Sequence, residues 1–445
     1  MRRAGRALPA GVLMLVAALF AGALSVSGCA RGPADRVTLR FWAMGREGEV
    51  LQDAVAAFER QNPGIHVVVQ QIPWGAAHEK MLTAHVGRST PDAAQLGNTW
   101  VSEFAALRAI EPLDPRIATS RVVRREGYFR GIWDTNVIDG VTYGVPWYVD
   151  TRLLFYRRDL LARAGYPSMP TNWRDWREAM RAVKRLPSDR EHFAIFLPTN
   201  EYTPWIVFGM QAGSPFLKDD ATRGAFSDSA YRAAMDFYLG LFRERLAPAI
   251  QGQGIANLYQ EFERGTFAMY ITGPWQLGEF RNRISPAMRD CWATAPLPGP
   301  TGPASGVSTA GGSSLVLFRE SRHKEEAWKF VEFLSRPEQQ LRFYHQTGDL
   351  PARVESWADT ALRSDPNIRS FGTQLERVLY EPRIPEWQQI SIKLMDKVEL
   401  AILGHARADS VLAGLDREVD QILEKRRWLV EKERRRSAGG AGGAP

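Results

Sequence analysis

The chain has 445 residues, of which 44% are hydrophobic, 24% charged and 11% aromatic, which is enough for two to three compact domains. This composition excludes wholesale disorder, and the 14 Trp and 12 Tyr residues supply more amphipathic ring surface than a core requires. The formal net charge is +7, but the charges are interspersed except in the basic stretch 425–436, so the composition does not favour a nucleic-acid-binding protein.

Residues 1–28 have the order of an export signal. Arginines at positions 2, 3 and 6 precede an apolar stretch at residues 8–23 and then a segment of small residues. A transmembrane anchor is the alternative, but the apolar run contains Pro9 and Gly11 and is short for a spanning helix. We therefore expect a cleaved lipoprotein signal peptide, whose removal lowers the net charge to +4.

The residues around Cys29 predict lipidation. Val26-Ser27-Gly28-Cys29 resembles the bacterial lipobox, in which a signal peptidase cuts before a cysteine that carries a diacylglycerol. The mature protein would then be lipid-anchored at the periplasmic or extracytoplasmic face of the cell membrane, with residues 29–36 as a tether. No later segment of the sequence reads as a membrane span. The other cysteine, Cys291, has no second thiol nearby, so we expect a buried structural thiol.

The first part of the mature chain alternates strands and helices. Period-2 apolar patterning predicts strands, and apolar residues at three- and four-residue steps predict helices, the first of which stops at Asn62-Pro63-Gly64. This order predicts an α/β fold with right-handed crossovers and a parallel sheet. The predicted elements are a strand at 37–42, a helix ending at 61, a strand at 65–72, a helix at 76–86, a strand at 93–96 and a helix at 101–107.

The middle of the chain is more helical and then breaks. Helical patterning dominates residues 152–245, which predicts a second lobe. Nine of the eighteen residues at 295–312 are Gly or Pro, which favours a crossing between lobes, and the strand and helix predicted after it suggest a return to the first sheet. The remaining predictions are a strand at 314–318, helices at 324–334, 389–403 and 408–427, and a disordered tail at 433–445.

An ordered set of motifs resembles the extracellular solute-binding proteins of ABC importers, in the carbohydrate branch that includes the maltose- and trehalose-binding proteins. The resemblance covers residues 37–387. The motifs are, in chain order, Leu39-Arg40-Phe41-Trp42, Ala57-Phe58-Glu59-Arg60-Gln61-Asn62-Pro63-Gly64-Ile65, Pro91-Asp92 with Trp100 and Phe104, Ile110-Glu111-Pro112-Leu113-Asp114, Tyr143-Gly144-Val145-Pro146-Trp147-Tyr148-Val149-Asp150-Thr151 with Leu154-Phe155-Tyr156, Phe267-Ala268-Met269-Tyr270 with Gly273-Pro274-Trp275, and Ala310-Gly311-Gly312.

The resemblance implies a two-lobed periplasmic-binding-protein fold, type II-like, in which each lobe is a mixed sheet flanked by helices and a hinge joins the lobes. Lobe one would comprise residues 37–145 plus 298–345, and lobe two residues 146–297 plus 346–432. A sugar bound between the lobes would close them, and the closed form would dock on the permease subunits of the importer. The family also implies a monomer without a cofactor.

Sugar recognition needs aromatic faces for the C–H faces of pyranose rings and polar groups for the hydroxyls. Asn98 stands where many members of the branch have Asp, so the hydroxyl pattern read there is expected to differ. The residues that match ligand-binding segments of the family are Glu47, Trp74, Asn98, Trp147, Tyr148, Asp150, Trp205, Tyr270, Trp275, Gly311, Gly312, Arg383 and Trp387.

Each of these residues also has a structural interpretation. A single Trp is as easily a core residue, although Gly-Pro-Trp at 273–275 favours ligand contact. For Asp150 the alternative to ligand contact is an N-cap role, and for Gly311 and Gly312 it is a turn with positive φ. For Glu47 the alternative is stabilisation of a helix N-terminus. The sequence leaves these alternatives open.

An enzyme is the alternative function class, since a secreted glycoside hydrolase also combines sugar-stacking aromatics with a carboxylate pair. The sequence contains no His-Glu-x-x-His, Gly-x-Ser-x-Gly or P-loop motif, and its seven histidines lack metal-ligand spacing. We therefore expect neither catalysis nor a metal. A binding protein for iron, phosphate or polyamines is a third interpretation, but it explains the large number of aromatic residues less well.

Overall fold

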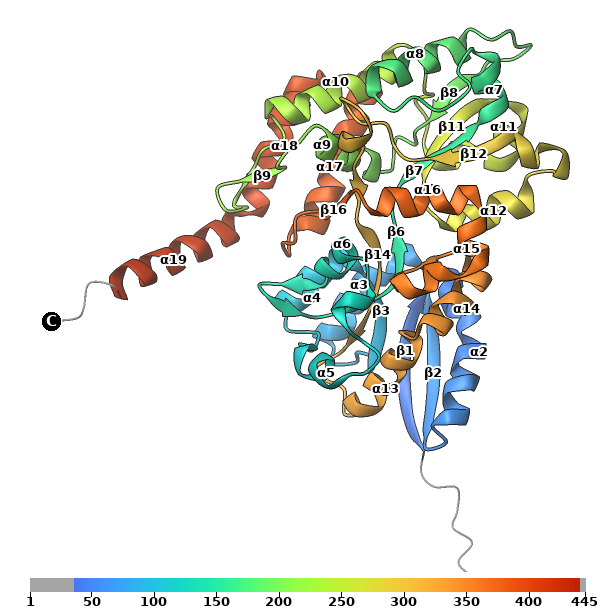
Figure 1. Cartoon of the computed structure of the whole chain (residues 1–445). Coiled ribbons are helices and arrows are strands. Elements are labelled where there is room, and N and C mark those ends of the chain that lie inside the picture. The colour runs from blue at the N-terminus through green and yellow to red at the C-terminus, as the bar shows by residue number, and fades with distance from the viewer. Residues whose placement is uncertain (1–35, 441–445) are drawn as a thin grey trace, which may run out of the picture.

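The computed structural model describes residues 36–440, which form two halves built on separate sheets (Figure 1). The first sheet has six strands in the order β15-β6-β14-β3-β1-β2, and the second has four in the order β12-β7-β11-β8. Cys29 and the predicted signal peptide lie outside the described residues. Among the described residues, no helix combines the length and apolarity needed to cross a membrane.

The first sheet begins with the predicted parallel unit. β1 (Val37–Met44) pairs in parallel with β2 (Ile65–Ile72) and β3 (Ala93–Gly97), which confirms the predicted crossover order. The connecting helices α2 (Gly45–Gln61) and α3 (Trp74–Val86) carry their apolar residues on the side that faces the sheet. β14 (Gly311–Leu317) joins this sheet antiparallel to β3, so the predicted return of the chain to the first sheet is also confirmed.

The second sheet is mixed and comes from the middle of the chain. β7 (Leu153–Arg157) and β11 (Phe267–Thr272) pair antiparallel, and β8 (Phe193–Phe196) joins β11 in parallel. β12 (Trp292–Ala295) closes the other edge. The helices that surround this sheet are α7 (Arg158–Arg163), α8 (Trp173–Lys184), α9 (Thr203–Gln211), α10 (Ser229–Arg243), α11 (Leu258–Arg264), α12 (Trp275–Arg283) and α16 (Pro366–Leu375).

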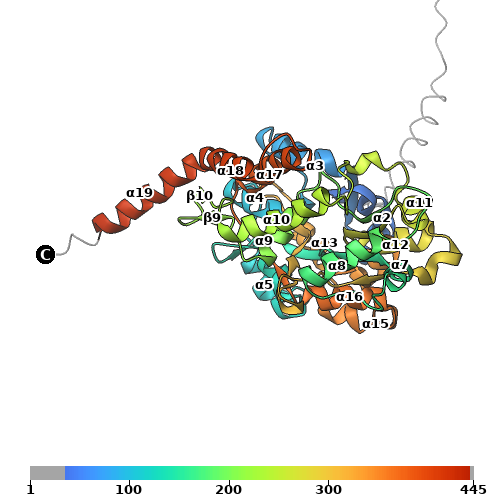
Figure 2. The same cartoon turned by 90° about the horizontal axis from the view of Figure 1, so that it is seen from above.

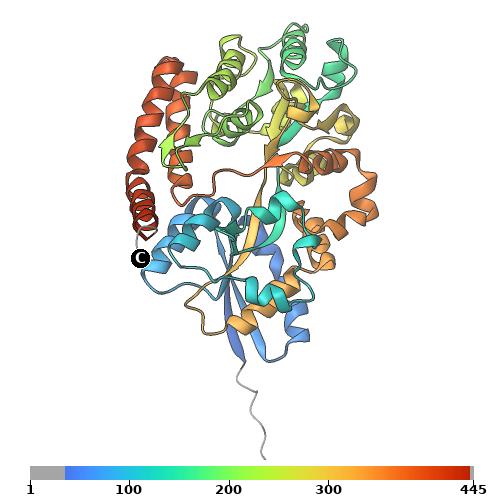
Figure 3. The ribbon, with the colours of Figure 1, turned by 60° about the vertical axis from the view of Figure 1, so that its left-hand side comes forward.

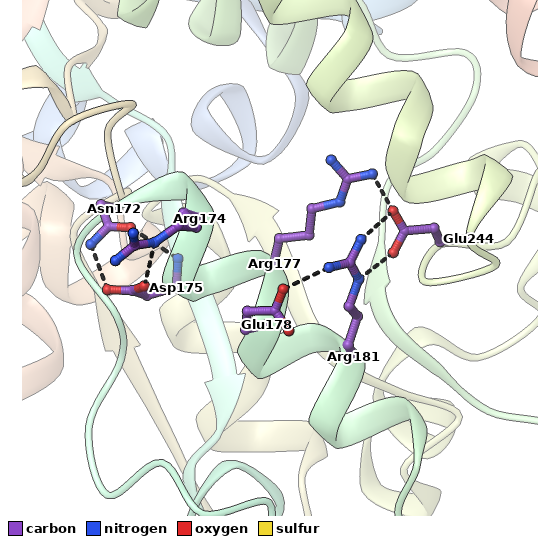
Figure 4. A network of polar contacts seen from close by, with 7 residues as sticks. All are labelled: Asn172, Arg174, Asp175, Arg177, Glu178, Arg181 and Glu244. Atoms are coloured by element: carbon purple, nitrogen blue, oxygen red, sulfur yellow. Dashed lines mark hydrogen bonds and ion pairs between the residues drawn. The ribbon is translucent and has the colours of Figure 1, made fainter.

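Helix α8 shows how the sequence positions these helices. Asn172 caps it by accepting a hydrogen bond from the backbone N–H of Asp175, and its apolar residues at three- and four-residue steps are buried. On its outer side, Arg181 donates hydrogen bonds of 2.6 and 2.8 Å to Glu244, which also pairs with Arg177 (Figure 4). This network ties α8 to the end of α10.

The chain crosses between the sheets at three places. β6 (Val145–Asp150) ends in the first sheet, and β7 begins in the second only two residues later. The second crossing leads from β12 to β14, within the Gly- and Pro-rich stretch that was predicted to cross. The third leads from β15 (Leu350–Pro351) of the first sheet to α16, which packs against β12 of the second. From α16 the chain runs through β16 (Val378–Leu379) along the junction to α17 (Trp387–Ile402), which packs in the second half. Figure 3 shows these segments between the two halves.

The remaining elements complete the two halves. β15 (Leu350–Pro351) pairs with β6 in the first sheet, so we place residues 146–151 and 346–351 with lobe one rather than lobe two. The other helices are α4 (Val101–Ala106), α5 (Asp114–Thr119), α6 (Arg130–Asp134), α13 (Lys324–Leu334), α14 (Pro337–Thr347), α15 (Thr360–Ser364) and α18 (Ala408–Ile422), and the other strand pairs are β4 (Val137–Ile138) with β5 (Val141–Thr142), β9 (Leu217–Lys218) with β10 (Arg223–Gly224), and β13 (Ser308–Thr309) with β16.

Two expectations need correction. Helix α19 spans Glu424–Gly440, so the tail predicted to be disordered from residue 433 is helical as far as Gly440, because Lys, Arg and Glu favour the helix before the glycines begin. Cys291 is half-buried rather than buried, because it lies at the end of a 3-10 turn, and it forms no disulfide among the described residues.

Candidate functional site

A polar cluster lies where β6 passes into β7. The guanidinium of Arg152 donates hydrogen bonds of 2.7 and 2.9 Å to the two carboxylate oxygens of Asp150, the last residue of β6. Its other nitrogen lies 3.5 Å from Oε1 of Glu201, which precedes α9. The same guanidinium stacks 4.5 Å from the ring centroid of Trp275, the first residue of α12. Three chain segments therefore meet around one cation.

This cluster is accessible, although it is set deeply between the sheets. The side chains of Asp150 and Glu201 are 24% and 28% exposed, and Trp275 is half-buried. Burial raises the pKa of Asp150 and of Glu201 above their usual values, and the charge of Arg152 opposes both shifts. Burial also raises the pKa of the nearby Tyr270 hydroxyl to about 12, so this group is a neutral donor and acceptor.

A second polar cluster surrounds Glu47 in the first turn of α2. Glu47 is 7% exposed and accepts a hydrogen bond of 2.7 Å from the hydroxyl of Tyr148 and a longer one of 3.3 Å from Nε1 of Trp74. Gln95 of β3 connects this cluster to β14, because its amide nitrogen lies 3.0 Å from the Tyr148 oxygen and 3.1 Å from Oγ of Ser313. All of these partners are neutral donors.

Asp349 adds another buried carboxylate beside this cluster. It lies between α14 and β15 and is 7% exposed. Burial raises the pKa of Asp349 to about 8, and the negative charge of Glu47 adds to the effect. Asp349 is therefore largely protonated at neutral pH, so it can donate a hydrogen bond that an ionised aspartate cannot.

Gly311 and Gly312 are required by the strand crossing itself. They pair with Asp150 and Val149, and a Cβ on Gly312 would lie 2.3 Å from the carbonyl oxygen of Tyr148. Gly312 also has a φ of +136°, which side chains rarely adopt. The close approach of β14 to β6 accounts for both glycines without a ligand, although both remain half-buried.

Three of the predicted aromatic contacts are core residues. Trp147, Trp205 and Trp387 are each 1% exposed. Trp147 stacks on Phe343 at 4.3 Å, and Trp387 donates a hydrogen bond of 2.5 Å to Glu381. Their faces contact protein only, which corrects their assignment to the ligand. Trp74 differs, because it is 39% exposed and packs edge-on against Trp100.

The segment between α16 and α17 is held against the first half. Arg383 is exposed and donates hydrogen bonds of 2.7 Å to the carbonyl oxygens of Asp134 and Val137. Trp100 donates to Gln388 at 3.0 Å, also across the two halves. Asn98 donates to the carbonyl of residue 310 at 2.7 Å.

These contacts leave little free space beside the segment between α16 and α17. Asn98 and Arg383 line a gap of about 10 Å³, which holds no more than a single water molecule. The two halves of the protein therefore lie in close contact at this point. A larger hollow, of about 540 Å³, lies farther along the same segment, between residues 210–221 and Leu379–Pro382.

The sequence analysis missed Arg152, Glu201 and Asp349. Arg152 follows the predicted Asp150 by two positions, so an acid-x-cation pattern at the end of a crossing strand was the available signal. Glu201 and Asp349 carry no comparable local signal, because only the packing of distant segments brings them to the junction. Among the described residues, no group of His, Cys, Asp and Glu has the arrangement of a metal site.

Two sheets joined by short crossing strands, with a partly exposed polar and aromatic cluster at their junction, define a two-lobed solute-binding protein. The family model described as bacterial extracellular solute-binding protein matches residues 43–341, more than half of the chain. The chain belongs to this family, with the two-lobed periplasmic solute-binding fold that the sequence predicted.

Relatives of known name agree with this assignment. The chain is similar to the solved structure of the sugar-binding protein MalE from the phytopathogen Xanthomonas citri, with 46% identity, a TM-score of 0.84, and coverage of 89% of this chain and 99% of that one. It is 26% identical to a Brucella abortus protein named as a binding protein, over 92% of this chain and 98% of the relative. It is 24% identical to the maltotriose-binding protein of Pyrococcus abyssi, over 76% and 71% respectively.

Proposed function

We propose that the protein is the substrate-binding component of an ABC sugar importer. It captures a neutral disaccharide or short oligosaccharide, maltose- or trehalose-like, between the two lobes and delivers it unchanged to the permease subunits. The observation that carries this proposal is the meeting of half-buried Trp275 with Asp150, Arg152 and Glu201 at the junction of the lobes. The 46% identity to a sugar-binding protein supports the ligand class.

The chemistry of this cluster suits a polyol ring. An indole face packs against the apolar C–H groups of a pyranose, and charged acceptors such as Asp150 and Glu201 bind hydroxyl protons more strongly than neutral acceptors do. Nη1 of Arg152 already donates to both oxygens of Asp150, so the other N–H groups of the guanidinium are the ones that can donate to hydroxyl oxygens. Tyr270 is 9% exposed and contributes its neutral hydroxyl beside Glu201.

From the ligand set expected from sequence, we retain the residues that reach the junction and are exposed or hydrogen-bonded there. Arg152, Glu201 and Asp349 join the set on the structural grounds given above. Closure of the lobes on the sugar by hinge motion would present one surface to the permease. The retained residues are Glu47, Trp74, Asn98, Tyr148, Asp150, Tyr270, Trp275, Gly311, Gly312 and Arg383.

Calorimetric titration of the purified protein with maltose, trehalose, maltotriose and a non-glucose disaccharide tests the proposal. We expect a dissociation constant in the micromolar range or tighter, about 8 kcal/mol of binding free energy. The sugar is recovered after incubation and analysed by chromatography. Recovery of hydrolysis products would support a glycoside hydrolase instead, and binding confined to phosphate, iron or a polyamine would reject a sugar ligand.

We also propose that lipid on Cys29 anchors the mature protein to the outer face of a cytoplasmic membrane or in a periplasm. The lipobox pattern supports this localisation, as does the extracellular family of the chain. Metabolic labelling with a radioactive fatty acid should mark the wild-type protein and not Cys29→Ala. Acylation of the Cys29→Ala protein would contradict the assignment.

A further inference from the structure

The last helix stands apart from the body of the protein. α19 follows α18 and projects away from both halves, as Figures 1 and 2 show from two directions. A basic helix on the surface normally has a partner for its charges, because like charges along one face repel each other. On one side of α19 the cations bond to the second half of the protein. Among the described residues, the cations of the other side pair at most within the helix, as Arg435 does with Glu431 at 4.0 Å.

One side of α19 is docked on the turn between β9 and β10. Arg426 and Arg427 each donate a hydrogen bond to a backbone carbonyl of this turn, at 3.0 and 2.9 Å. Arg434 forms an ion pair with Asp220 of the same turn. These three arginines fix the orientation of the helix, so the opposite side is presented to solvent.

The opposite side combines exposed apolar residues with cations. Trp428 and Leu429 are 57% and 43% exposed, and Lys425, Lys432 and Arg435 are exposed beside them. At about 100° per residue, these five fall within an arc of about 120° that contains no carboxylate. The ammonium of Lys432 lies 4.6 Å from the Trp428 ring centroid. We call these five residues the α19 face.

The charge of the mature chain is concentrated in this helix. The sequence of α19 contains seven Lys and Arg against three Glu, a net charge of +4. Without residues 1–28, which carry three arginines and no acid, the whole chain also has a net charge of +4. Everything else in the mature chain therefore sums to zero, so α19 dominates attraction toward an anionic surface.

We propose that the α19 face binds the surface of an anionic phospholipid bilayer. Trp is the side chain best suited to the boundary between headgroups and acyl chains, and Lys and Arg keep their charges at the phosphates while their stems lie along apolar surface. Charge complementarity favours anionic lipid over a neutral surface, because each Lys or Arg near such a membrane adds to binding. The contact is independent of sugar binding and of the lipid proposed on Cys29.

Vesicle co-sedimentation tests this proposal on the unlipidated chain from residue 30 to 445, which retains every described residue. Vesicles of phosphatidylcholine alone and of phosphatidylcholine with phosphatidylglycerol are compared at low and high salt. We expect at least tenfold stronger binding to the anionic vesicles, lost at high salt. Equal binding to both vesicle types, or none to either, would overturn the proposal.

Two variants locate the contact. Lys425→Gln/Lys432→Gln/Arg435→Gln should weaken binding to anionic vesicles about tenfold at low salt, and Trp428→Ala should also weaken it at low salt although it leaves the charge unchanged. The matched control is Arg163→Gln/Arg185→Gln/Arg243→Gln, which removes three exposed cations elsewhere on the second half and should change binding less than twofold. An equal loss in the control would show that total charge, and not the α19 face, governs binding.

The second variant also separates a bilayer from a second copy of the chain. Analytical ultracentrifugation without vesicles should show a monomer for both the wild type and Trp428→Ala. Self-association that Trp428→Ala abolishes would assign the α19 face to a dimer and reject the bilayer. Circular dichroism of each variant checks that α19 is still helical, so a loss of binding can be assigned to the side chains.

Discussion

The guanidinium of Arg152 lies 4.5 Å over the ring of Trp275. It also occupies both carboxylate oxygens of Asp150 through its two hydrogen bonds. The guanidinium thus covers one face of the indole and binds both oxygens of the carboxylate, although we propose that the indole and the carboxylate contact the sugar. A ligand that uses them must displace Arg152 or approach the opposite face of the indole, and the following predictions separate the contributions of these residues.

Trp275→Ala should weaken sugar binding by about 2 kcal/mol or more, because a half-buried aromatic ring at a binding site is a typical energetic anchor. The effect on folding should be smaller, since the ring is not enclosed by the core. Calorimetry with the preferred sugar and thermal unfolding of the same preparation measure the two effects. Unchanged affinity in a destabilised protein would reject the stacking role.

Trp387→Ala should show the reverse pattern. This indole is 1% exposed and hydrogen-bonded to Glu381, so its removal should cost about 3 to 5 kcal/mol of the free energy of unfolding. Affinity measured on the folded fraction should change little. A large loss of affinity without loss of stability would return Trp387 to the ligand set.

Arg152→Gln should destabilise the protein by about 2 kcal/mol at pH 8 and by less at pH 5. Burial holds the pKa of Asp150 and of Glu201 above the unfolded values, and without the guanidinium both pKa values rise further. The folded state then binds more protons than the unfolded state, so its stability falls as pH rises through this window. Urea unfolding at both pH values measures the effect, and Arg152→Lys, which keeps the charge, should lose less.

Asp349→Asn should flatten the dependence of stability on pH. The pKa of Asp349 is about 8 in the folded protein and near 3.8 when unfolded, so its contribution is complete below pH 4 and is lost as pH rises toward 8. The wild type should therefore lose about 5 kcal/mol over this range that the variant does not lose. Parallel curves for the two proteins from pH 4 to pH 8 would contradict a protonated Asp349.

Gly312→Ala should destabilise the strand crossing more than Gly213→Ala does. Both glycines have positive φ, but an added Cβ at position 312 meets the Tyr148 carbonyl at 2.3 Å, whereas at position 213 it meets nothing within 4 Å. The control should lose about 1 kcal/mol from backbone strain alone. Chemical denaturation compares the two, and equal losses would show that the close approach of β14 to β6 is readily relaxed.

Local patterns predicted the first sheet well. The alternation at 37–42 and the stop at Asn62-Pro63-Gly64 gave β1 and α2, because both signals arise from neighbouring residues. The predictions failed where tertiary contact decides the outcome. Trp147 and Trp275 both follow a proline in aromatic-rich segments, yet only their packing partners make one a core residue and the other half-exposed.

Asp349 shows the same limit for the candidate site. Its position between a helix and a two-residue strand gives no signal in the sequence. Its raised pKa depends first on burial and then on the charge of Glu47, about three hundred residues earlier in the chain. Sequence reasoning could identify residue types suited to a sugar. Sequence reasoning could not identify that Asp150 and Glu201 share the cation of Arg152, because this depends on the packing of distant segments.

The two-residue link between β6 and β7 also has a mechanical consequence. Only Thr151 and Arg152 separate the last position of one sheet from the first position of the other. If the two halves rotate about this link, the displacement of each residue increases with its distance from the link. Side chains beside Arg152 then keep their positions relative to one another during the rotation, whereas side chains far from the link move the greatest distance. Residues beside the link are therefore suited to bind the part of the ligand that binds first, before the halves close. Residues far from the link are suited to contacts that form only when closure is complete.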